Sequence, residues 1–186
     1  KAINYYSDKD SIYIADAIYF RGQANFRTGN FIMSINDFTL ASKFYEDLNE
    51  KDYVYFTRES IISIYGTTGF TQKAIDERGK LINDKIKNKH FDYLGDAYYN
   101  QSISYNEIGD FDREEECLKL ALKYNLADKS MNHFLLVNYA QLGKYYAVNN
   151  QLNEAKKYFE LAEKEIRYRD KESELYYRYQ LALSYY

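Results

Sequence analysis

Hydrophobic and small residues recur at helical spacing in pairs of adjoining segments along this chain. The clearest pair lies in residues 139–162. One face of each expected helix is apolar or small at steps of three and four residues: Tyr139, Leu142, Gly143 and Tyr146 in the first helix, and Leu152, Ala155, Phe159, Ala162 and Ile166 in the second. Asn149 and Asn150 lie between them as a polar turn that can cap the second helix. The pattern predicts a hairpin of two antiparallel helices, in which Gly143 and Ala155 let the backbones approach closely.

Weaker copies of this hairpin precede it. The pattern predicts helices over 11–28 and 31–48, over 53–65 and 70–86, and over 93–108 and 111–126. Aligned by their small residues, the hairpins begin near 15, 55, 95, 136 and 176, which gives a period of 40 or 41 residues. A fixed period of this size indicates a solenoid built from repeated units. We therefore expect one domain over 1–186, with repeats at 15–48, 55–88, 95–128 and 136–169, the end of a preceding repeat at 1–10, and the first helix of a further repeat at 175–186.

Polar residues at the expected turns support the division, and two substitutions depart from the repeat. Asn30, Asp52 and Asp110 are candidate caps for the helices that follow them. Arg78 occupies a place where the other hairpins have Phe or Leu, and Glu114 occupies the place of an alanine. The hairpin at 55–88 is therefore the most degenerate of the four.

Composition agrees with an almost wholly helical chain. There is no proline among 186 residues, where average usage predicts about nine, and proline is the residue that most disrupts helix interiors. Aromatic residues reach 18%, with 23 Tyr, 11 Phe and no Trp. The fold class we predict is thus all-α.

Charge and cysteine content exclude several classes of function. The net charge of −3 argues against direct contact with nucleic acid, which favours a basic face. The single cysteine, Cys117, excludes an internal disulfide and a cysteine-built zinc site. No apolar run approaches the ~20 residues of a membrane span. The chain starts at Lys1 and ends within a periodic apolar stretch, so we expect a fragment of a larger protein; the cytoplasm is the expected compartment, and the periplasm follows instead if the whole protein has a signal or membrane segment.

Catalytic and metal-binding patterns are not found in the sequence. There is no phosphate-binding glycine loop, no HExxH and no GxSxG. His90 and His133 fall at starts of first helices and are expected to be exposed or capping. Glu114, Glu115 and Glu116 point in different directions on a helix, so a solvated first turn is expected in place of a cation site. Cys117 lies in an acidic helical setting, which predicts a raised thiol pKa. The prediction is a non-enzymatic chain without cofactor or metal.

The best-preserved hairpin resembles the tetratricopeptide repeat. That family's pattern is W-x2-L-G-x2-Y, then A-x3-F, then Pro. Tyr139-x2-Leu142-Gly143-x2-Tyr146 and Ala155-x3-Phe159 match it except that Tyr139 replaces Trp and Arg167 lies about where Pro is expected. HEAT and armadillo units of 40–47 residues are the structural alternative, but they do not require the Gly/Ala pairing seen here. The resemblance implies a right-handed superhelix of antiparallel helical hairpins, with about four full repeats and partial terminal helices. Long repeats rich in Tyr and Phe are similar to those of Rap-like peptide-sensing regulators and of Bacteroidetes sensor kinases and transcription regulators.

The resemblance also implies a binding surface, because in tetratricopeptide arrays the first helices line a concave groove. Carried over to this chain, the groove residues with amide, aromatic or apolar side chains, and one lysine, are Tyr19, Gln23, Phe26, Tyr99, Asn100, Ile103, Asn106, Gln141 and Lys144. Glu59, Ser63 and Ala140 fall at further groove positions. The function expected is binding of a protein or peptide segment in the concave face, as the sensing or partner-binding part of a bacterial signalling or transcription regulator. The alternative is a structural scaffold that forms a homodimer and takes no groove ligand.

Overall fold

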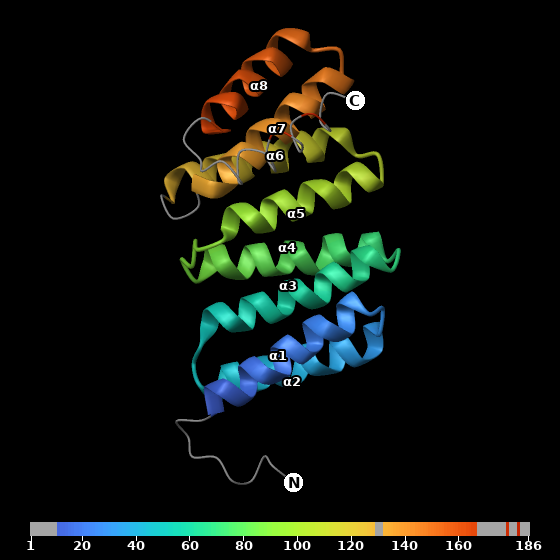
Figure 1. Ribbon diagram of the computed structural model, residues 1–186, viewed down its shortest axis with the longest axis vertical. Helices are drawn as coiled ribbons and strands as arrows, with labels where there is room; N and C mark the ends of the chain where they lie inside the picture. Colours follow the sequence, from blue (N-terminus) through green and yellow to red (C-terminus); the bar gives the residue numbers. More distant parts are fainter. Residues whose placement is uncertain (1–10, 129–131, 167–177, 179–181, 183–186) are drawn as a thin grey trace. The chain divides into compact units, whose positions relative to one another are not determined.

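The computed structural model describes residues 11–128 and 132–166, together with Arg178 and Ala182 (Figure 1). These residues form eight α-helices, and no strand occurs among them. The helices are α1 Ser11–Arg27, α2 Phe31–Asp47, α3 Lys51–Thr67, α4 Thr71–Lys87, α5 Leu94–Glu107, α6 Phe111–Ala127, α7 Asn132–Val148 and α8 Leu152–Ile166. The all-α prediction is confirmed. The segments predicted at 1–10 and, except for two residues, at 175–186 lie outside the described residues.

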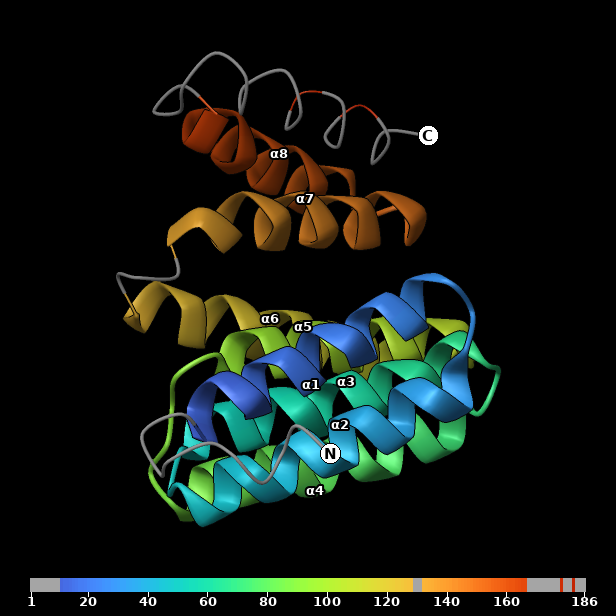
Figure 2. The same cartoon turned by 60° about the horizontal axis from the view of Figure 1, so that its bottom comes forward.

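The 40-residue period is present in the helix boundaries. Second helices begin at residues 31, 71, 111 and 152, so successive repeats are offset by 40, 40 and 41 residues. Within this series α1–α2, α5–α6 and α7–α8 pack as hairpins, and α2–α3 and α6–α7 pack between hairpins (Figures 1 and 2). Contacts divide the chain into two compact units, residues 1–84 and residues 85–186, each of which is described by itself.

A left-handed residue ends each first helix at the same place in the repeat. The backbone φ is +77° at Gly29, +81° at Gly69, +74° at Gly109 and +58° at Asn150. The next amide then bonds back to the carbonyl five residues before it, as Asn30 does to Asn25 at 2.8 Å. In the last repeat the side chain of Asn149 donates to the Tyr145 carbonyl, so it closes α7 and does not cap α8.

Small and large side chains are matched across the hairpins. A Cβ added at Gly22 would lie 2.9 Å from the Phe38 ring, and one added at Gly143 would lie 2.6 Å from the Phe159 ring. Each phenylalanine therefore packs directly on a glycine backbone. The hydroxyl of Ser34 is buried and donates to the Gly22 carbonyl at 2.8 Å, which ties α2 to α1. The close approach predicted from the small residues is confirmed.

The last hairpin has an extensive apolar core. Residues from α6, α7 and α8 form one buried cluster, which includes Leu118, Leu136, Tyr139, Leu142, Tyr146, Ala155, Phe159, Ala162 and Ile166. Leu152, which the pattern assigns to the same face, is 68% exposed because it is the first residue of α8, at the turn. That assignment was wrong.

The second hairpin replaces part of its apolar core with an ion pair. Arg78 is 3% exposed, and its Nε lies 2.9 Å from Oε1 of Glu59 on α3. A charged pair at this place explains why the hairpin scarcely matches the repeat pattern.

Two of the predicted helix caps have different outcomes. Asp52, the cap expected for α3, lies inside the first turn of that helix, because α3 begins at Lys51. In the third hairpin the predicted cap is confirmed: the Asp110 carboxylate accepts the backbone N–H of Arg113.

Among the described helices, none combines the length and the apolar character needed to cross a lipid bilayer.

Candidate functional site

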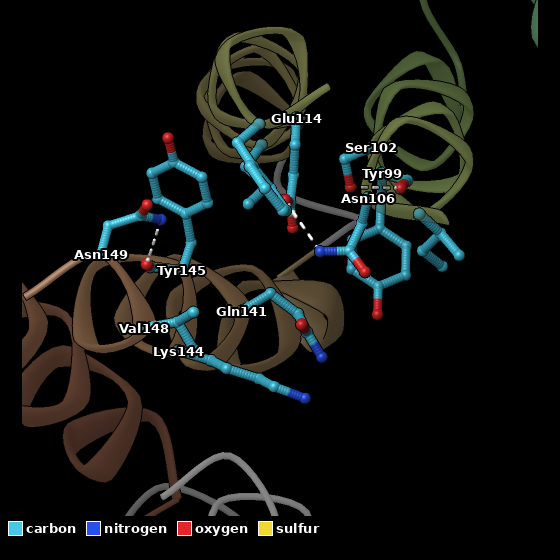
Figure 3. A pocket seen from close by; sticks show the side chains of 12 residues that line it. Tyr99, Ser102, Asn106, Glu114, Gln141, Lys144, Tyr145, Val148 and Asn149 are labelled. Carbon is cyan, nitrogen blue, oxygen red and sulfur yellow. Dashed lines mark hydrogen bonds between the residues drawn. The ribbon is translucent and has the colours of Figure 1, made fainter. Parts of the chain in front are cut away.

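A cavity of about 240 Å³ opens between α5, α6 and α7 in the second unit (Figure 3). Helix α5 contributes Tyr99, Ser102, Ile103 and Asn106. Helix α6 contributes Phe111, Glu114 and Leu118. The C-terminal half of α7 and the residue after it contribute Gln141, Lys144, Tyr145, Val148 and Asn149. Two successive first helices thus form the walls of the cavity, and the second helix between them forms its base.

Buried polar contacts hold the helices around this cavity in register. The amide of Asn125 on α6 donates to the Asn138 amide oxygen on α7 at 2.8 Å, and both residues are 1% exposed. Gly95 on α5 leaves room for this pair, since a Cβ there would collide with the Asn125 side chain. The Tyr146 hydroxyl also donates to the Glu115 carboxylate at 2.6 Å, joining α7 to α6. Because unsatisfied buried amides are costly, the Asn125–Asn138 contact favours one register of α6 against α7.

The lining mixes exposed apolar groups with amides. Ile103 is 44% exposed, Phe111 48% and Val148 71%. Amide side chains come from Asn106, Gln141 and Asn149, and the only charged side chains in the lining are those of Glu114 and Lys144. Such a surface can bury a side chain and can also exchange hydrogen bonds with a peptide backbone.

Two neighbouring carboxylates on α6 are in opposite electrostatic situations. Burial raises the pKa of Glu114, although the hydrogen bond from Asn106 and the nearby charge of Lys144 act in the other direction. Hydrogen bonds from Lys119 and Tyr146 lower the pKa of Glu115. Both carboxylates are half-buried, so the expected solvated turn was wrong for these two residues, while Glu116 is exposed as expected.

The thiol of Cys117 is buried, and burial raises its pKa to about 12. The negative charges of Glu116 and Asp110 add to the effect. The direction predicted from the sequence is confirmed, with burial as the main cause. A thiol with such a pKa is almost entirely protonated at neutral pH and is a weak nucleophile.

Five of the nine predicted groove residues line this cavity together: Tyr99, Ile103, Asn106, Gln141 and Lys144. Asn100 is half-buried on α5 and is not part of the lining. Ala140 is 6% exposed and belongs to the core, so its groove position was wrong.

The three remaining predicted groove residues, Tyr19, Gln23 and Phe26, lie on α1 in the first unit. There the Gln23 amide donates to the Tyr19 hydroxyl at 2.9 Å. The Tyr19 ring packs against Phe38, with 5.4 Å between ring centroids, and Phe26 packs against Phe31. These side chains are engaged within their own unit, and their role in binding stays a prediction.

The sequence reasoning missed the cavity residues that do not lie on first-helix groove positions. It took side chains from first helices at one-turn intervals, which omits Phe111, Glu114 and Leu118 on α6 and the end of α7. The sequence did contain an indication for one of them, because Glu114 stands where each of the other three repeats has a small residue.

No family model matches the chain, and no curated protein matches it. Several solved structures, however, are similar to the chain. The chain is similar to BtubC (BKLC) from P. vanneervenii, with a TM-score of 0.69 and 16% identity over 84% of this chain and 64% of that one, so it spans less than two thirds of the BtubC structure. It is also similar to a putative kinesin light chain of Podosopora anserina with nearly identical TPR-like repeats, with a TM-score of 0.66 and 14% identity over 91% of this chain and 84% of that one. A single-substitution variant of that protein gives a TM-score of 0.68 at 14% identity, over 95% of this chain and 86% of the other. Identities this low bear on the fold alone. The chain therefore has a tetratricopeptide-like fold of about four 40-residue helical repeats.

Proposed function

We propose that this chain is a non-enzymatic module that binds an extended peptide or protein segment along α5 and α7. One observation carries the proposal: five residues assigned to a groove from repeat position alone line a single open cavity. They come from two successive first helices, and two of them, Ile103 and Lys144, occupy equivalent places 41 positions apart. The binding surface is therefore a property of the repeat and not of one loop.

The chemistry of the cavity suits a peptide. The Asn106, Gln141 and Asn149 amides can each donate and accept hydrogen bonds, as the backbone of an extended peptide requires. Ile103, Phe111 and Val148 offer apolar surface to a side chain. The cavity volume of about 240 Å³ is below the roughly 300–1,000 Å³ of typical small-molecule sites. It suits one side chain of a longer ligand better than a whole metabolite.

The lining offers little to an enzyme. Its carboxylate, Glu114, accepts a hydrogen bond from Asn106, and the residues that line the cavity include no histidine and no cysteine. The Ser102 hydroxyl donates to the Tyr99 carbonyl at 2.6 Å, and burial raises the pKa of Tyr145. A nucleophile activated by an adjacent base is the usual requirement for covalent catalysis, and this lining does not supply one. Binding is the better proposal.

In the cell, we place this module in a bacterial signalling or transcription regulator, as its sensing or partner-binding domain. The support is the long repeat rich in Tyr and Phe, which is similar to the repeats of such regulators. An acidic chain of this kind would act through a protein partner, and the output would come from elsewhere in the regulator.

A dimerisation scaffold is the second candidate function. Tyr13 is 71% exposed and Phe20 is 62% exposed, and they lie seven residues apart on one face of α1. Exposed aromatic side chains on one helix face can form an interface with a second copy. Sedimentation equilibrium distinguishes the two functions, because a scaffold dimerises without ligand and loses the dimer in Phe20→Asp.

Changing the cavity is expected to weaken peptide binding. Peptides are first selected against the intact chain from a displayed random library, and their Kd is measured by fluorescence anisotropy. In Tyr99→Ala/Gln141→Ala we expect a Kd at least ~10-fold higher, since hot-spot side chains contribute about 1–2 kcal/mol or more each. Both walls of the cavity lose a contact in this variant.

A matched control removes the same side-chain types elsewhere. Tyr13→Ala/Asn36→Ala takes one tyrosine and one amide from exposed positions on α1 and α2. It is expected to leave the Kd within about twofold, well under the 1.4 kcal/mol of a tenfold change. Equal loss in both variants, or loss only in the control, contradicts the proposed location.

A further inference from the structure

We propose that the cavity between α5, α6 and α7 recognises a basic side chain, lysine or arginine, of the bound peptide, with Glu114 as its ionic partner. This inference rests on the proposed function and names the chemistry of its ligand.

The first support is the place of Glu114 in the repeat. The equivalent residues are Ser34, Ala74 and Ala155, offset by 40, 40 and 41 residues. They are 0%, 0% and 4% exposed and fill the hairpin interior. In the third repeat a carboxylate stands there instead, half-buried and facing an open cavity. A half-buried charge is destabilising unless it is compensated. The hydrogen bond from Asn106 and the charge of Lys144 offset this cost only in part, because burial still raises the pKa of Glu114, so its presence needs an explanation beyond packing.

The second support is the geometry of the carboxylate. The Asn106 amide donates to Oε2 of Glu114 at 2.9 Å and fixes its orientation (Figure 3). Oε1 accepts no hydrogen bond from the described residues, and Lys144 forms no ion pair with them. In Figure 3 the Lys144 side chain extends away from Glu114. One oxygen of an oriented carboxylate is therefore available to a ligand.

The third support is the field at the cavity wall. Burial is the main cause of the raised pKa of the Tyr145 hydroxyl. The negative charges of Glu115, Glu114 and Asp112 raise this pKa further. Only Lys119 acts in the opposite direction there, and its ammonium is already paired with Glu115 at 2.7 Å. A half-buried site with this bias attracts a cation more strongly than an exposed one, because solvent screens it less.

Arg113 on α6 and Lys144 on α7 do not reverse this bias. Arg113 is paired with Asp110 at 3.1 Å. Lys144 is exposed at the rim, where solvent screening is greatest. The apolar surface of Ile103, Phe111 and Val148 would cover the methylene groups of a lysine or arginine while its head reaches Glu114. An acidic side chain would instead meet a carboxylate of the same charge.

The test compares capped amino acids whose side chains differ in charge, two of them with the same shape. N-acetyl-arginine amide, its neutral isostere N-acetyl-citrulline amide and N-acetyl-glutamate amide are titrated into the ¹⁵N-labelled chain. The arginine probe is expected to shift the amide signals of Asn106, Gln141 and Tyr145 and to bind at least ten times more tightly than the citrulline probe. In Glu114→Gln, which keeps the shape of the side chain, the preference should fall to less than twofold. Glu116→Gln removes an exposed carboxylate two residues away and should keep the preference.

Other outcomes overturn the inference and separate it from the proposed function. Equal binding of arginine and citrulline probes, a preference for the glutamate probe, or an unchanged preference in Glu114→Gln each shows that Glu114 does not select a cation. If library selection yields peptides that bind at the cavity without enriched lysine or arginine, the inference fails and the binding function stands. If no peptide is selected at all, both fail.

Discussion

Arg78→Ala is expected to lower the free energy of unfolding by about 3 kcal/mol, the scale observed when one partner of a buried ion pair is removed. Arg78 is 3% exposed and its guanidinium lies 2.9 Å from the Glu59 carboxylate, whose side chain is only 22% exposed. The substitution leaves that carboxylate without its cation and removes the packing of the arginine stem between α3 and α4. Urea denaturation followed by circular dichroism measures the loss.

A second ion pair in the same hairpin provides the control. Arg58 lies 2.7 Å from Asp84, but their side chains are 32% and 49% exposed. Solvent screening limits such a pair, so Arg58→Ala should cost less than about 1 kcal/mol. In Arg78→Leu/Glu59→Leu, which removes both charges, stability should recover relative to Arg78→Leu alone. Similar losses in Arg58→Ala and Arg78→Ala would contradict a buried role for Arg78.

Gly143→Ser is expected to destabilise the chain by about 2 kcal/mol, within the range for overpacked cores. A Cβ at this position would lie 2.6 Å from two atoms of the Phe159 ring, and both residues belong to the tightly packed α7–α8 hairpin. The third repeat has Ser102 and Leu118 at the equivalent places. Adding Phe159→Leu should therefore offset part of the loss, and a double-mutant cycle from urea denaturation measures the coupling.

Gly79 offers a control of opposite sign. It lies within α4, and a Cβ there would meet no atom within 4 Å. Gly79→Ala should raise stability by up to about 1 kcal/mol, because alanine is the better helix former. If Gly143→Ser were also stabilising, or if Phe159→Leu gave no coupling, the matching of small and large residues across the hairpin would be wrong.

Most of the fold was predictable because the same pattern of small and large residues occurs in four successive hairpins. The spacing that places Gly143 against Phe159 in the last hairpin recurs as Gly22 against Phe38 in the first, and both pairs are in contact in the structure. Helix ends were predicted within two residues at most boundaries, since left-handed glycines such as Gly29 and Gly109 end the first helices. Leu152 and Asp52 were misplaced because spacing alone does not show where a helix starts.

The binding site was only partly predictable. Tyr99 and Gln141 follow from repeat position, but the cavity also needs Glu114 and Phe111 from a second helix. Their contribution depends on how α5, α6 and α7 pack against one another, which the spacing of residues along the sequence does not give. Ala140 shows the reverse error: its register suggested the groove, and the packing of α7 places it in the core.

The most direct measurement is chemical-shift mapping of a library-selected peptide on the ¹⁵N-labelled chain. We expect the largest shifts at Tyr99, Ile103, Asn106, Gln141 and Lys144, which line one cavity between α5, α6 and α7. Shifts confined to other surfaces, such as the exposed α1 face around Tyr13 and Phe20, would contradict peptide binding at this cavity.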